Sequence, residues 1–129
     1  MDGGNTFRQA RFLGTAVLGN GLSPTIQVAD TLEAGETVEW YRFRIRGRAS
    51  SAPLKPIIGF GGGEFATRME LFQAAKNKPG KLLARLDNIN GQKQRSLPNG
   101  TFFIKVSGTP APAGSGQFAT FVAQINLFG

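Results

Sequence analysis

The side chains that most often perform catalysis are nearly absent from this chain. It contains no histidine and no cysteine, so no Ser-His-Asp triad, no Cys-His nucleophile and no histidine-ligated zinc can be assembled from it. None of its serines sits in a G-x-S-x-G elbow. Its eight acidic residues are scattered and indicate neither a glycosidase carboxylate pair nor a calcium site. We therefore predict a protein that is not an enzyme and needs no cofactor.

One glycine-rich stretch has the form of a nucleotide-binding motif. Gly61-Gly-Gly-Glu-Phe-Ala66 matches G-x-G-x-x-A after an apolar segment. In that motif an acidic residue about twenty residues further along the chain binds the ribose. Asp87 lies at about this distance. The motif also requires a helix after the glycines, whereas residues 67–73 are few and alternate like a strand. The stretch is therefore interpreted as a loop of a β-protein.

Composition indicates one β-rich, strongly basic domain. A chain of 129 residues can bury a core without disulfides or metals. Its 18 glycines, 7 prolines and 11 phenylalanines are typical of short strands joined by many turns. The net charge of +7 favours an acidic partner, whether nucleic acid, anionic lipid or protein. No apolar stretch is long enough to span a bilayer.

Strand-like segments alternate with turns along the whole sequence. The clearest two are Glu39-Trp-Tyr-Arg-Phe-Arg-Ile45 and the Thr-Phe-Phe-Ile-Lys-Val segment that follows the Pro98-Asn99-Gly100 turn, because aromatic and β-branched residues dominate both. The predicted strands are residues 15–18, 25–28, 37–46, 57–60, 67–73, 81–86, 101–106 and 117–127, and the turns and loops between them include 14–24, 29–36, 76–80 and 87–91. Because no helical period is present, we predict an all-β, antiparallel β-sandwich with jelly-roll-like character over residues 10–129, preceded by a short N-terminal arm over residues 1–9.

Alternation assigns the side chains of these strands to two faces. The predicted core consists of Tyr41, Phe43, Ile45, Leu71, Phe102, Ile104 and Val106. The opposite face of residues 37–46 carries Val38, Trp40, Arg42, Arg44 and Arg46, with Arg48 just beyond. Phe103 and Lys105 are expected to point outward as well. This outward set is interpreted either as a solvated sheet face or as a basic-aromatic docking surface, because arginine and aromatic residues are enriched in interface cores.

The order of these features resembles the bacterial pre-peptidase C-terminal domain, a small β-sandwich. The resemblance covers about residues 10–127 and rests on the two clear strands, on Ala10-Arg-Phe-Leu-Gly14 and on Met69-Glu-Leu-Phe72. It implies a binding or scaffolding module. Some members of that family use acidic positions for calcium, but here Glu39 and Ala66-Thr-Arg-Met69 stand where aspartates are common. We therefore do not expect a calcium site.

The resulting hypothesis is a non-catalytic interaction protein that docks onto an acidic protein surface within a larger assembly. The predicted contact residues are Arg8, Arg11, Trp40, Arg42, Arg44, Arg46, Arg48, Phe103 and Lys105. Standalone domains of this kind are familiar from cyanobacteria, and this resemblance extends the hypothesis to a linker-like subunit of the phycobilisome. No signal peptide is visible, so a cytoplasmic location is expected. The alternatives are a polysaccharide- or matrix-binding accessory domain of a secreted system and, less favoured, a nucleic-acid-binding module.

Overall fold

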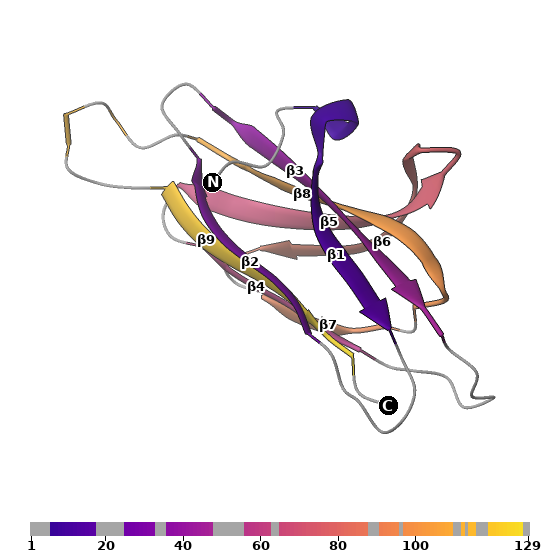
Figure 1. Cartoon of the computed structure of the whole chain (residues 1–129). Coiled ribbons are helices and arrows are strands. Elements are labelled where there is room, and N and C mark those ends of the chain that lie inside the picture. Colours follow the sequence, from indigo (N-terminus) through magenta and orange to yellow (C-terminus); the bar gives the residue numbers. More distant parts are fainter. Residues whose placement is uncertain are drawn as a thin grey trace.

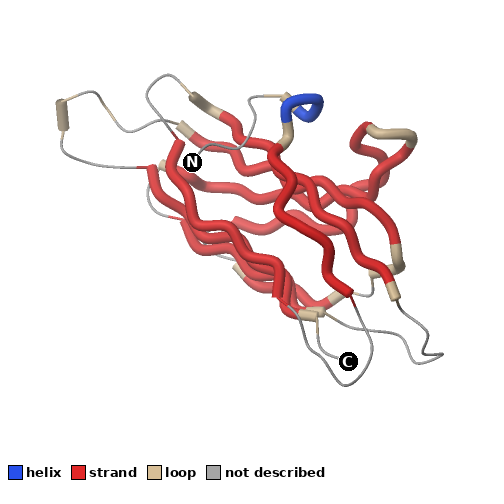
Figure 2. Tube along the Cα trace, in the orientation of Figure 1, coloured by secondary structure: helices blue, strands red, loops and turns tan. Residues whose placement is uncertain are grey.

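The computed structural model of the chain describes its strands and some of the residues that connect them. The described residues are 6–17, 25–32, 36–47, 56–62, 65–87, 91–95, 97–109, 112, 114–115 and 119–127. Strands make up most of this part of the chain, with one short helix at its beginning (Figure 2). The elements are η1 (Phe7–Gln9), β1 (Arg11–Val17), β2 (Thr25–Leu32), β3 (Val38–Arg46), β4 (Ile57–Gly62), β5 (Ala66–Ala75), β6 (Lys78–Asp87), β7 (Gln92–Gln94), β8 (Gly100–Gly108) and β9 (Ala119–Asn126).

The strands form two sheets that lie against each other as two layers (Figure 1). One sheet has five strands in the order β1-β3-β8-β5-β6, and the other has four in the order β2-β9-β4-β7. All pairings are antiparallel except that of β1 with β3. The predicted all-β sandwich, dominated by antiparallel pairs, is confirmed.

Several predicted boundaries are wrong, because pairing extends strands through residues that are typical of turns. β1 continues past Gly14, whose φ of +126° accommodates the register shift between Phe12 and Thr15. β2 continues to Leu32, since all eight of its residues pair with β9. β6 begins at Lys78, inside a predicted turn. The strand β7 was not predicted, because its residues are all polar and only its pairing with β4 defines it as a strand.

Part of the predicted N-terminal arm lies on the sandwich. Phe7–Gln9 forms the 3-10 helix η1, which contacts β3 and β6. Residues 1–5 of that arm are outside the described residues, as are most of the loops predicted at 14–24 and 87–91.

The core lies between the sheets, and the predicted strand phase is confirmed. All seven predicted core residues are buried, at 0–1% exposure. Phe43 stacks on Phe102 of the neighbouring strand with ring centroids 5.2 Å apart. β2, β4 and β9 contribute the facing apolar side chains from the other sheet, among them Val28, Ile58 and Ile125.

A polar contact joins the two sheets inside this core. The Tyr41 hydroxyl donates a hydrogen bond of 2.8 Å to Oδ2 of Asp30 on β2. Burial, then this bond and the nearby charges of Asp30 and Glu39, raise the pKa of Tyr41 far above its ordinary value. The neutral phenol is therefore strongly favoured in the folded protein.

The first prediction tests the core. We expect Phe43→Ala to lower the free energy of unfolding by about 3–5 kcal/mol, because it removes a buried ring and leaves a cavity against Phe102. The measurement is chemical denaturation, with Val122→Ala at a 39% exposed position as the control. A loss below about 1 kcal/mol for Phe43→Ala would place Phe43 outside the core.

The second prediction uses the fact that Tyr41 is the only tyrosine of the chain. At about pH 9, Tyr41→Phe should be less stable by about 1–3 kcal/mol, because the Asp30 carboxylate loses its donor. Since the pKa of Tyr41 is raised on folding, its contribution is complete below the unfolded pKa of about 10 and is lost as the pH rises further. The stability difference between wild type and variant should therefore shrink between about pH 9 and pH 11. If the free energies of unfolding of wild type and variant differ by the same amount across this pH range, the raised pKa of Tyr41 is contradicted.

Candidate functional site

The outer face of the five-stranded sheet carries most of the predicted contact residues. On β3, Trp40, Arg42 and Arg44 alternate with the buried core residues. Their direct partners on β8 are Lys105, Phe103 and Thr101, in that order. The outward direction predicted for this stripe follows from the confirmed core phase on the same strand.

Phe103 lies on this face but is not exposed. Only 2% of its surface is accessible, because Phe7 of η1 and Trp40 pack edge-on against it with centroids 6.3 Å away in both cases. Phe7 also contacts Trp40 at 6.2 Å, and Phe72 extends the cluster at 5.9 Å from Trp40. The expectation that Phe103 is an exposed contact residue is therefore wrong: the helix that begins the described chain covers it.

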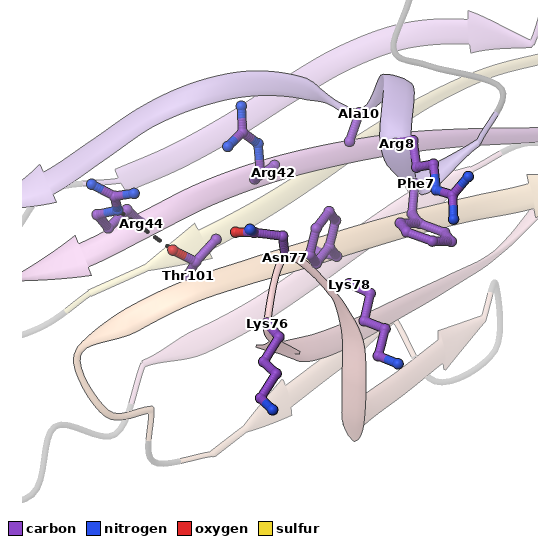
Figure 3. A pocket seen from close by; sticks show the side chains of 10 residues that line it. Phe7, Arg8, Ala10, Arg42, Arg44, Lys76, Asn77, Lys78 and Thr101 are labelled. Carbon is purple, nitrogen blue, oxygen red and sulfur yellow. Dashed lines mark hydrogen bonds between the residues drawn. The ribbon is translucent and has the colours of Figure 1, made fainter.

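Beside this aromatic cluster, the face is hollowed (Figure 3). The hollow has a volume of about 520 Å³ and is bounded by η1, β3, β8 and the turn between β5 and β6. Its described lining residues are Phe7, Arg8, Ala10, Arg42, Arg44, Lys76, Asn77, Lys78, Thr101 and Phe103. Five of these are cationic and none is acidic. We call this feature the basic hollow.

The three arginines of the basic hollow contact uncharged groups, which do not neutralise their positive charge. The Arg42 guanidinium lies 5.1 Å from the ring centroid of Phe12, which is 46% exposed on β1. The Arg44 Nε donates a long hydrogen bond of 3.4 Å to Oγ1 of Thr101. Arg8 lies 5.6 Å from the Phe7 ring. Within the described part of the chain, none of these three arginines forms an ion pair, so their terminal nitrogens remain able to bind an external acceptor.

Two of the hollow's cations, Lys76 and Lys78, lie at the tip of the β5–β6 hairpin, whose role was not predicted. The β5–β6 hairpin reverses at Lys76 and Asn77, with φ of 52° and 67°, in the left-handed region that two-residue hairpins require. Asn-Gly is the favoured pair for such turns, and a lysine in the first position is strained. The sequence placed a turn at residues 76–80, but no local signal showed that it would lie beside Arg42 and Arg44.

Two other predicted contact residues have different surroundings. Arg11 pairs with Tyr41, whose side chain points into the core, and its charge is close enough to oppose the raised pKa of Tyr41. Arg11 therefore belongs to the inner side of β1 and not to the N-terminal arm, and its role as a contact residue stays a prediction. Lys105 lies over the Trp40 ring, with Nζ 5.5 Å from the centroid, and lines a separate hollow of about 590 Å³ with Arg68.

The last two lie toward the end of β3. Arg46 is exposed on that strand but does not line the basic hollow. Arg48 is outside the described residues.

The outer face of the other sheet has a different character. On β2, β4 and β9, the described residues that alternate with the buried ones carry no charge. They are Thr25, Gln27, Ala29, Thr31, Ile57, Gly59, Gly61, Thr120, Val122, Gln124 and Asn126. The cationic residues of the basic hollow therefore have no counterpart among these outer residues of β2, β4 and β9.

No described helix is long and apolar enough to cross a membrane. No group of three or more acidic side chains placed to hold a metal ion occurs among the described residues.

Comparison with known proteins finds similarity at the level of fold. No protein-family model and no curated protein sequence matches this chain. PliG of Aeromonas hydrophila, a periplasmic lysozyme inhibitor of g-type lysozyme, superposes over 91% of this chain and 97% of its own with a TM-score of 0.51 and 18% identity. The pre-peptidase C-terminal domain of collagenase from Bacillus anthracis covers 89% and 92%, with a TM-score of 0.53 and 11% identity. PliG of Salmonella Typhimurium covers 92% and 98% at 15% identity, and its TM-score of 0.42 supports no further inference.

These comparisons confirm the resemblance to a pre-peptidase C-terminal domain as a likeness of fold. They give no support to a cyanobacterial origin. The expected cytoplasmic location is corrected, because PliG of Aeromonas hydrophila is a periplasmic protein, which points away from the cytoplasm.

The third prediction concerns the strained turn. Replacing Lys76 and Asn77 by asparagine and glycine should raise the free energy of unfolding by about 0.5–1 kcal/mol, because the new pair suits left-handed φ values. The measurement is chemical denaturation. Lys78→Asn removes the same charge at a residue without a positive φ and is the matched control. Equal stabilisation by Lys78→Asn would show that relief of charge repulsion, and not of backbone strain, is responsible.

Proposed function

We propose that this chain is a non-catalytic binding domain that docks onto an acidic protein through the outer face of its five-stranded sheet. The observation that carries the proposal is the basic hollow, where five cationic side chains surround one concavity whose described lining contains no acid. A concentration of one sign of charge in a concave site attracts groups of opposite charge and accelerates their association.

The surrounding sheet does not neutralise this charge. Glu70 points outward on β5 but is nearly buried, and its Oε2 lies 3.2 Å from Nη2 of Arg85 on β6. Its charge is thus already engaged away from the hollow. The net charge of +7 acts in the same direction at longer range.

The composition of the face suits a protein partner. Arginine and aromatic side chains dominate the energetically important centres of interfaces, and here Arg8 lies beside Phe7 and Arg42 beside Phe12. Because Phe12 and Thr101 hold Arg42 and Arg44 in place, less side-chain entropy is lost when a carboxylate binds them.

The structural neighbours are compatible with this role. PliG is named for the inhibition of a lysozyme, an action on another protein, and such a task needs a binding surface and no catalytic residues. The neighbours do not support the finer hypothesis of a phycobilisome linker, so the proposal stops at an acidic protein partner.

The fourth prediction tests this function. Replacing Arg42 and Arg44 together by serine should leave the fold intact, because neither side chain belongs to the core, while retention of the native partner falls by at least about tenfold. Removing one member of a desolvated charged pair typically costs about 2–5 kcal/mol, whereas an exposed charge contributes about 0–1 kcal/mol. The measurement is quantitative co-purification from a native extract at several salt concentrations, with circular dichroism to verify folding.

Two controls separate the alternatives. Lys93→Ser removes an exposed charge from β7 of the other sheet and should change retention little. Nuclease treatment should leave the association intact, which distinguishes a protein partner from nucleic acid. If the double variant retains the same partners at the same salt concentration, the stripe is a solvated face and the proposal fails.

A further inference from the structure

We infer that the basic hollow receives a protruding acidic segment of the partner, which packs one apolar side chain against Phe7 and Ala10 while its carboxylates meet the surrounding cations. This inference rests on the proposed function and specifies the chemistry of the bound segment. It follows from the apolar side of the hollow, the arrangement of its cations and the elements that stand on either side.

The hollow has one preformed apolar side. Phe7 and Ala10, both half-buried, line it there, and the buried Phe103 supports Phe7 from beneath, together with Trp40. The volume of about 520 Å³ falls within the range of small-molecule pockets, roughly 300–1,000 Å³. The hollow is therefore large enough to admit an inserted side chain. A flat partner surface that met only the cations would leave the hollow unfilled.

The cations are distributed around the hollow without converging on one point. In Figure 3, Lys76 and Lys78 extend on one side and Arg42 on the opposite side, while Arg44 and Arg8 lie at the two ends. A single phosphate or sulfate could contact only some of them. Several separate carboxylates along one segment match this arrangement better, since each can meet a different cation.

The borders of the hollow favour a segment over a flat surface. The helix η1 and the β5–β6 turn bound the β3–β8 floor from two directions, and both stand out from the body of the sheet in Figure 1. A flat folded surface would meet these two borders before it reached the part of β3 and β8 that lies between them. A loop or an extended terminus can pass between them.

Trp40 provides the readout, because it is the only tryptophan of the chain and packs on both Phe7 and Phe103. The probe is a synthetic peptide in which one leucine is flanked on each side by two acidic residues. We expect a saturable change in tryptophan fluorescence on titration. A peptide of equal charge with serine in place of leucine should bind about tenfold more weakly or worse, because it buries no apolar side chain.

Variants on one strand locate the site. Arg42→Gln should weaken binding of the leucine peptide by about tenfold or more. Arg46→Gln removes the same charge from the same strand outside the hollow and should weaken it by less than about twofold. Both arginines lie outside the core, and thermal melts verify that each variant folds.

Four results would overturn the inference while leaving the proposed function standing, provided that the Arg42/Arg44 double variant still loses the native partner. These are equal binding of the serine and leucine peptides, equal losses for Arg42→Gln and Arg46→Gln, full competition by inorganic phosphate at the same ionic strength, and no saturable change up to about 1 mM peptide. Conversely, leucine-specific binding together with an unchanged native complex would support the hollow as a receptor and reject the proposed docking function.

Discussion

The pairing of β3 between β1 and β8 is the constraint on which the rest of this structure depends. Because side chains alternate along a strand, a fixed register sends Tyr41 and Phe43 into the core and Arg42 and Arg44 to the outside. A slip of one residue would exchange the two sets and bury arginines. The free-energy cost of exposing the apolar side chains and burying the arginines therefore fixes the position of the cationic face together with that of the core.

The Tyr41–Asp30 hydrogen bond extends this constraint to the second sheet. It joins β3, an interior strand of the five-stranded sheet, to β2, which is an edge strand of the four-stranded sheet. Apolar packing between sheets is tolerant of small displacements, whereas a buried hydrogen bond is directional and costly to leave unmade. The contact thus favours one relative placement of the layers that support the outer face.

The basic hollow concentrates features that do not favour folding by themselves. Five cations share its border, and Lys76 adopts a left-handed conformation that glycine or asparagine would adopt at lower cost. Like charges held together and strained turns lower stability unless other interactions compensate. The fully buried core of the sandwich supplies that compensation, and an acidic segment bound in the hollow would reduce the repulsion.

The sequence alone determined the fold class, the core phase of β3 and β8 and the basic character of the outer face, because period-two alternation and composition are local properties of the chain. Only the tertiary structure decided what surrounds those strands. Phe7 covers Phe103, the parallel pairing of β1 turns Arg11 inward, and the β5–β6 turn brings Lys76 beside Arg42. Each of these outcomes depends on which strands become neighbours. The pairing of strands that are distant in the chain is determined by burial and hydrogen bonding over the whole sheet, and no local sequence pattern encodes it.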